Sequence, residues 1–176
     1  HVQATSIHEG LLDDAAKLVI LATDREGYGE LCQLVTLGRR RKEKGSYSLA
    51  WSDLDGGMPG CLALLVSEKE EHARALAERL RGRAWIAAEL LRGPDDRAQL
   101  ARLRALGRAC GLPLAAAGDV HMHVRSRRPL QDTLTAIRLG TPVHACGHAL
   151  HANAERHLRA RVRLAQLYPS ELLAET

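Results

Sequence analysis

The chain has 176 residues, of which 45% are hydrophobic and 26% charged, a balance typical of a single globular domain, here residues 1–176, with its own apolar core. Its four widely spaced cysteines form no C-x-x-C pair, which argues against a structural zinc ribbon. The sequence holds no run typical of a membrane span or a secretory signal, so we expect a cytoplasmic protein with reduced thiols and no membrane partner.

The net charge of +4 is unevenly distributed along the chain. Residues 1–120 carry 17 Lys and Arg against 17 Asp and Glu, whereas residues 121–176 carry 8 against 4. Six of the nine histidines also lie in the second region. This excess favours a polyanionic partner such as nucleic acid, although an ordinary solvated surface also produces a surplus of this size. Both interpretations stay open.

Hydrophobic periodicity predicts alternating strands and helices after a polar start. The first sixteen residues are mixed in character and predict either a loop or a boundary of the segment. The predicted strands span residues 17–22, 61–66, 85–91 and 113–118, and the predicted helices span residues 25–37, 68–80 and about 96–110. Residues 45–59 predict a loop with a short helical turn. Because strands and helices alternate, we expect an α/β fold whose strands pair in parallel through right-handed crossovers.

The first predicted helix follows a capping residue, either Thr23 or Asp24. Its apolar face is formed by Tyr28, Leu31, Leu34 and Val35. The basic run over residues 39–42 either complements the dipole of this helix or contacts phosphate, and we favour the first interpretation.

The fourth predicted strand leads into a group of possible metal ligands, Asp119, His121 and His123. In an extended chain alternate side chains share a face, so a D-x-H-x-H pattern can present all three together. Carboxylate and imidazole ligands suit zinc, manganese or iron. Ligands gather at the C-terminal ends of strands in parallel α/β folds, which favours a metal site over a simple polar exit from the core.

The last third of the chain predicts loops and three further helices. A loop ending at Pro129 holds three arginines, Arg125, Arg127 and Arg128. They are candidates for contacts with nucleic acid or with another domain, and the alternative is that they are plain surface residues. Helices are predicted over residues 130–139, over 154–167 with Asn153 as its cap, and from 169 onward. Leu158, Val162 and Ala165 are expected to face inward in the second of these helices, and Arg156, Arg159, Arg161 and Arg163 largely outward. Residues 143–153, with His144, Cys146, His148 and His151, predict a loop in preference to a second metal cluster.

Several stretches together resemble bacterial DNA polymerase III alpha subunits. LVILATDREGYGELC (18–32) and GLPLAAAGDVHMH (111–123) are similar to segments of that family, and VRSRRPLQDTLTAIR (124–138) is similar to its error-prone, damage-inducible branch. Residues 168–176 resemble the end of the family's N-terminal PHP (polymerase and histidinol phosphatase) domain. The resemblance covers residues 17–176.

The resemblance implies a distorted β/α barrel with mainly parallel strands, of which this chain would form the C-terminal two-thirds. In the family a metal cluster lies at the C-terminal strand ends, and its ligands come from an early H-x-H pair, an Asp, a His, a Glu, further His and Cys positions, and a closing D-x-H. Only that last pair maps here, onto Asp119 and His121, with His123 as a third candidate. Lys17 stands where many relatives have a His, and Ser67 falls where the family has a Cys. Two ligands do not complete a site, so we expect a zinc, manganese or magnesium ion in the intact domain rather than in this segment alone.

By the same resemblance, the parent protein would be an error-prone DNA polymerase, a nucleotidyltransferase acting in damage-induced translesion DNA synthesis. Its expected partners are DNA, other translesion-synthesis proteins and, indirectly, the sliding clamp. The palm carboxylates needed for nucleotidyl transfer are not part of this chain, so we do not expect the segment to polymerise DNA by itself. Two alternatives are a non-catalytic scaffold and a stand-alone PHP-type, metal-dependent phosphoesterase.

Overall fold

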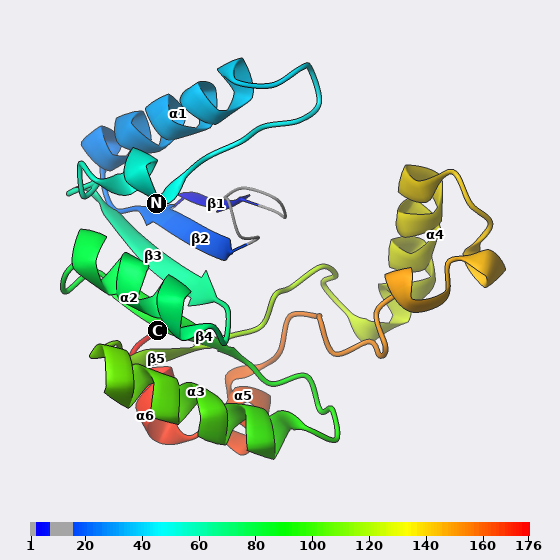
Figure 1. Ribbon diagram of the computed structural model, residues 1–176. Coiled ribbons are helices and arrows are strands. Elements are labelled where there is room, and N and C mark those ends of the chain that lie inside the picture. The colour runs from blue at the N-terminus through cyan, green and yellow to red at the C-terminus, as the bar shows by residue number, and fades with distance from the viewer. Residues whose placement is uncertain (1–2, 8–15) are drawn as a thin grey trace.

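A computed structural model describes residues 3–7 and 16–176, and these form an α/β unit built on one curved sheet (Figure 1). The strand order among the described residues is β1-β2-β3-β4-β5. The strands are β1 (Gln3–Ile7), β2 (Lys17–Ala22), β3 (Cys61–Val66), β4 (Ala84–Glu89) and β5 (Leu114–Ala117). Three helices follow strands β2, β3 and β4 in turn: α1 (Arg25–Arg40), α2 (Glu70–Arg79) and α3 (Asp96–Cys110).

The alternation of strands and helices over residues 17–117 confirms the prediction from periodicity. Asp24 caps α1, because its Oδ1 accepts a hydrogen bond from the backbone N–H of Gly27 at 2.7 Å. Gly111 ends α3 in the left-handed conformation, with φ of 68°, which glycine adopts without a steric penalty. The predicted turn between α1 and β3 is also present, as a 3₁₀ turn over Trp51–Leu54.

The prediction of a loop over the first sixteen residues is wrong for Gln3–Ile7, which form β1. This strand pairs antiparallel with β2, with Gln3 opposite Ala22 and Ile7 opposite Leu18. The outer edge of β2 presents backbone N–H and C=O groups, and a neighbouring strand satisfies them whatever its side-chain polarity. Residues 1–2 and 8–15 of the predicted loop lie outside the described residues.

The expectation of parallel pairing holds for β3, β4 and β5 but is wrong for β2 and β3. These two strands run antiparallel, with Ala22 opposite Cys61 and Lys17 opposite Val66. The segment between α1 and β3 returns the chain to the end of the sheet where β2 finished. There the backbone N–H and the hydroxyl of Thr23 donate to the carbonyl oxygen of Gly60, at 3.0 and 2.9 Å. The start of β2 therefore lies at the same sheet edge as the C-terminal ends of β3, β4 and β5.

The core lies between the sheet and helices α1, α2 and α3. Strand register places buried residues opposite one another: Leu18 with Leu65, Ile20 with Ala63, and Leu65 with Ile86. Leu31 and Leu34 of α1 face this core as predicted, whereas Tyr28 is 48% exposed, contrary to the prediction. The opposite face of β2 and β3 is also apolar but only half-buried, and it carries Val19, Leu21, Leu62 and Leu64.

The last third of the chain leaves the sheet and returns to it (Figure 1). Helix α4 (Arg128–Leu139) follows a 3₁₀ turn and begins two residues earlier than predicted, with Pro129 in its first turn. With the turns Val143–Ala145 and Gly147–Ala149, it lies well away from α1, α2 and α3. The chain then returns to form α5 (Arg161–Leu167) and α6 (Ser170–Ala174), the second of which contacts β5.

The helix predicted from residue 154 begins only at Arg161. Asn153 donates to the carbonyl oxygen of Leu91 at 2.7 Å instead of capping a helix, and His157 forms an isolated β-bridge with Met122. These tertiary contacts hold residues 153–158 out of helical conformation. As a result Leu158 and Val162, both predicted to face inward, are 64% and 70% exposed, and Ala165 is exposed as well.

No helix among the described residues is long and apolar enough to span a bilayer.

The closest approach between α1 and the segment before β3 depends on glycine. A Cβ atom added at Gly27 would lie 1.9 Å from the carbonyl oxygen of Gly60, whereas one added at Gly29 would meet nothing within 4 Å. We expect Gly27→Ala to lower the free energy of unfolding by about 1–3 kcal/mol, because backbone atoms cannot yield as a flexible side chain would. Gly29→Ala is the matched control and should raise it by about 1 kcal/mol through helix propensity. Urea unfolding measures both, and equal effects of the two substitutions would contradict the proposed close contact.

Candidate functional site

Charged side chains from three strands meet at the sheet edge formed by the C-terminal ends of β3, β4 and β5. Lys17 is the first residue of β2, Glu89 is the last of β4, and Asp119 follows β5 by two residues. Lys17 reaches this edge only because β2 is antiparallel to β3. Arg156 joins them from the segment between α4 and α5. We call these four residues, together with His121, the edge cluster.

The carboxylate of Asp119 is the centre of the edge cluster. Its Oδ1 accepts from Lys17 Nζ at 3.2 Å, and its Oδ2 accepts from Arg156 Nη1. The same Nη1 lies 3.6 Å from Glu89 Oε2. The side chains of Lys17 and Arg156 are each 20% exposed and that of Asp119 is 16% exposed. In such partly buried surroundings charges are screened less than at an open surface, so each carboxylate depends on its cationic partner.

The pair of Lys17 and Asp119 also reports on the shape of the sheet. Strands β2 and β5 are three positions apart in the strand order, which corresponds to about 14 Å in a flat sheet. Two side chains of these lengths barely cover that separation. The contact therefore depends on a sheet that curves, and Figure 1 shows α1, α2 and α3 arranged along an arc on one side of the sheet.

His121 is attached to the edge cluster through its side chain and its backbone. Its Nε2 lies 3.3 Å from Asp119 Oδ2, and its backbone N–H donates to the carbonyl oxygen of Arg156 at 2.9 Å. Its ring centroid is 4.9 Å from that of His151. Burial, aided by the charge of Lys17, lowers the pKa of His121, and burial followed by the proximity of His121 lowers the pKa of His151.

Of the three predicted ligands, the structure brings Asp119 and His121 together, while His123 is exposed. The D-x-H-x-H argument assumed an extended chain, but Asp119 has a φ of +40°. This turn breaks the alternation that would have placed three side chains on one face. Within residues 3–7 and 16–176, no three His, Cys, Asp or Glu side chains are grouped closely enough to hold a metal ion.

The edge cluster does not fit a divalent cation with the residues it contains. A metal needs lone pairs that point at it, yet both oxygens of the Asp119 carboxylate accept hydrogen bonds from cationic side chains. Lys17 and Arg156 already supply the positive charge that a bound metal ion would contribute next to Asp119. Their ammonium and guanidinium groups are donors with no acceptor capacity, so neither residue can serve as a ligand in this state.

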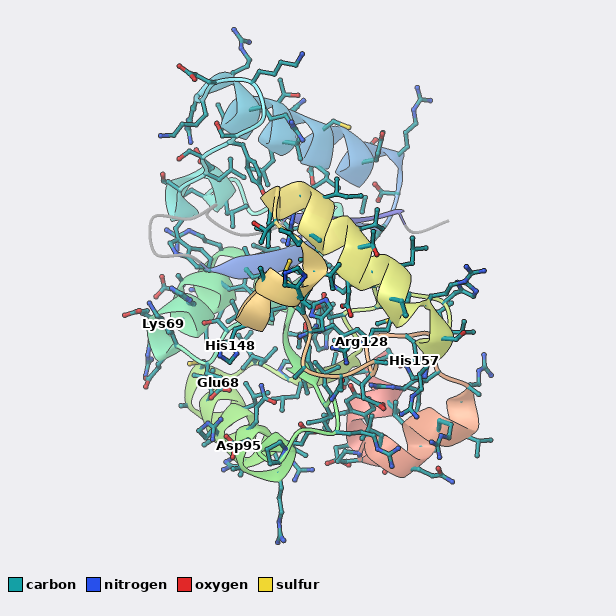
Figure 2. All side chains as sticks on the ribbon, turned by 90° about the vertical axis from the view of Figure 1, so that its right-hand side faces the viewer. Glu68, Lys69, Asp95, Arg128, His148 and His157 are labelled. Atoms are coloured by element: carbon teal, nitrogen blue, oxygen red, sulfur yellow. The ribbon has the colours of Figure 1, made fainter. Side chains whose placement is uncertain are left out.

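The three arginines predicted to contact nucleic acid or another domain differ in their surroundings. Arg125 forms an ion pair with Glu155. Arg128 lies 3.3 Å from Asp132 and donates to the carbonyl oxygen of His151 at 2.5 Å, and Figure 2 shows it near the N-terminal end of α4. Arg127 is exposed. Their role in binding stays a prediction.

Sequence reasoning missed three members of the edge cluster, because Glu89 gave no signal beyond being a residue of the third predicted strand. Lys17 was noticed only as a departure from the family resemblance, and its charge in front of an apolar strand is the signal that could have identified it. Arg156 was expected on the outer face of a helix, so its pairing with Asp119 had no local signal. Arg159 was also expected to face outward, but its side chain is only 5% exposed.

Comparison with known proteins shows clear relatives and one negative result. No family model matches the chain. It is 53% identical over 171 residues to a protein of Dechloromonas aromatica, 56% over 165 residues to one of Azoarcus sp., and 48% over 169 residues to one of Methylococcus capsulatus. All three are named error-prone DNA polymerase, and the matches cover 93%, 89% and 94% of this chain. The chain spans only about one sixth of their length, 17%, 16% and 16%, so it is homologous to one segment of these proteins.

The lowered pKa values of His121 and His151 predict a loss of stability in mild acid. Their ordinary pKa is 6.5, so below that pH the unfolded chain takes up these protons more readily than the folded chain does. We expect the free energy of unfolding to fall as the pH decreases from about 7.5 to about 5.5. Chemical unfolding at a series of pH values measures this dependence.

The double variant His121→Gln/His151→Gln should show a shallower pH dependence over the same range. His148, exposed on the turn after α4 (Figure 2), provides the matched control, since His148→Gln should keep the pH dependence of the unaltered protein. Identical pH profiles for the unaltered protein and the double variant would refute the assignment of this effect to the His121–His151 pair.

Proposed function

We propose that this chain is a structural, non-hydrolytic part of the PHP-type domain of an error-prone DNA polymerase, and that nucleotidyl transfer takes place elsewhere in that protein. In this proposal the full-length protein copies damaged DNA in translesion synthesis. Its DNA contacts and its other partners, including the sliding clamp, then belong to the whole polymerase rather than to this segment. The segment supplies a rigid β/α platform.

Three observations support the polymerase part of the proposal. Identity near one half over about nine-tenths of the chain relates it to proteins named error-prone DNA polymerase. The resemblance of residues 124–138 to the error-prone branch agrees with that relationship. A basic C-terminal third also suits a protein that works next to nucleic acid.

The single observation that carries the structural role is the double occupation of the Asp119 carboxylate. Lys17 Nζ and the Arg156 guanidinium engage one oxygen each. The PHP-type phosphoesterase chemistry requires that carboxylate to bind a metal ion that activates water. With two cations already in place, the edge cluster neutralises charge without a metal, and it ties β2, β5 and the segment before α5 to one another.

The sheet itself supports a barrel-like domain in the longer protein. Val19, Leu21, Leu62 and Leu64 form an apolar surface on the face of β2 and β3 opposite the core, yet they are only half-buried. Open sheets that face water on one side usually carry polar residues there. Strands that line the inside of a β/α barrel are apolar on both faces instead. Further strands of the full-length polymerase would close this face.

A double-mutant cycle in the full-length protein tests the structural role. Asp119→Asn leaves Lys17 and Arg156 without their carboxylate, and Lys17→Met leaves Asp119 with one cation fewer. We expect each single substitution to lower the free energy of unfolding, and the pair to show a coupling energy of about 1 kcal/mol. Primer extension on undamaged and abasic templates, assayed well below the unfolding transition, should keep its kcat in all three variants.

Measurements of bound metal and of DNA hydrolysis can overturn the proposed structural role. We expect Asp119→Asn to leave the amount of zinc, manganese and magnesium per chain unchanged, and DNA phosphodiester hydrolysis to be insensitive to the substitution. Arg104→Gln is a matched control, because Arg104 pairs with Glu171 at the surface, away from the edge cluster. Stoichiometric metal that is lost together with hydrolytic activity in Asp119→Asn would overturn the non-hydrolytic role and favour the phosphoesterase. Absence of primer extension would overturn the polymerase assignment separately.

A further inference from the structure

We propose that a cavity between the segment before α5 and α5 itself binds a phosphoryl group. The cavity has a volume of about 200 Å³. Four arginines line it together with one histidine and one glutamate: Arg92, Arg125, Arg159, Arg163, His157 and Glu155. We call it the arginine cavity. None of its residues belongs to the edge cluster, so the inference does not depend on the function proposed above.

The charge of the arginine cavity selects an anion. Four guanidinium groups face a single carboxylate, that of Glu155, which is already paired with Arg125 and lies 3.5 Å from Arg159 Nη2. Glu155 is itself buried, so its charge is committed to these partners. An excess of positive charge remains around the cavity. Guanidinium groups stay protonated at any physiological pH, so this excess is permanent.

Arg159 is the most buried arginine of the arginine cavity. Its side chain is 5% exposed. One terminal nitrogen donates to the carbonyl oxygen of Glu155 at 2.7 Å, and the other lies 3.4 Å from that of Leu90. Its Nε is buried and finds no hydrogen-bond partner among the described residues. The Arg159 guanidinium also interacts with the hydroxyl of Tyr168, so Arg159 is a fixed part of the cavity wall that contributes its positive charge.

The size of the arginine cavity limits the ligand. Pockets for drug-sized molecules usually measure about 300–1,000 Å³, so 200 Å³ suits a phosphoryl group better than a whole nucleotide. Arginine forks bind phosphate oxygens in bidentate geometry, which matches the lining residues. Two sources share this chemistry, namely free inorganic phosphate and the terminal phosphate of a DNA strand.

His157 completes one side of the arginine cavity. Its Nδ1 lies 2.8 Å from the carbonyl oxygen of Ala154, so Nδ1 carries a proton and the ring is held in place by the backbone. Its backbone is fixed as well, through the bridge to Met122. Figure 2 shows His157 between the N-terminal end of α4 and the C-terminal helices. A rigid lining lowers the entropic cost of ordering the site when an anion binds.

The test uses the full-length protein and three probes: inorganic phosphate, a 5′-phosphorylated oligonucleotide, and the same oligonucleotide with a 5′-hydroxyl. Arg159 supports the fold, so the substitutions are made at exposed lining residues, Arg92→Gln and Arg163→Gln. We expect inorganic phosphate, titrated by calorimetry, to bind about tenfold more weakly to each variant, because a charge-assisted hydrogen bond is lost. Arg161→Gln is the matched control, since Arg161 is an exposed arginine on the same helix outside the cavity.

The oligonucleotides distinguish the two sources. If the cavity takes a strand end, the 5′-phosphorylated oligonucleotide binds more tightly than the 5′-hydroxyl form, and Arg163→Gln removes the difference. If it takes free phosphate, inorganic phosphate binds with the expected dependence on Arg92 and Arg163 while the two oligonucleotides bind alike. The proposal is overturned if no phosphate probe binds, or if Arg161→Gln weakens binding as much as Arg163→Gln does.

Discussion

The carboxylate of Asp119 is the point at which distant parts of the chain are joined. It contacts Lys17, which lies 102 residues earlier in the sequence, and Arg156 on the segment that returns from α4. Arg156 in turn approaches Glu89 at the end of β4. One partly buried carboxylate thus joins the start of β2 and the returning segment to the end of β5, across a sheet that curves. The contact with Lys17 depends on the antiparallel entry of β2, which brings a lysine to an edge otherwise formed by strand C-termini.

Local sequence patterns predict the elements of this fold better than their orientation. Strands β2 to β5 and helices α1 to α3 follow from apolar runs, caps and glycines, because those signals act over a few residues. The direction of β2 relative to β3 depends on how residues 41–60 return to Gly60, and no periodicity records that path. The prediction of a helix over residues 154–160 is wrong for a related reason. Their helix pattern is overridden by the contacts of Asn153 with Leu91 and of His157 with Met122.

The candidate site was predictable only in part. The sequence pointed to Asp119 and His121, and the structure brings both to the sheet edge. It could not show that Asp119 turns with a positive φ, nor that its oxygens are occupied by cations from remote elements. Arg156 and Arg159 appeared as ordinary arginines of a helical surface. Their burial becomes visible only when residues 153–158 form bends that contact Leu91 and Met122 instead of a helix.

The strand order leaves β1 and β5 each paired along a single side within the described residues. An unpaired strand edge offers a row of backbone donors and acceptors to any other extended chain. In a longer polymerase, neighbouring parts of the same polypeptide are available to cover such edges. Produced by itself, the segment would be prone to intermolecular strand pairing, and self-association would then be the first property altered by truncation.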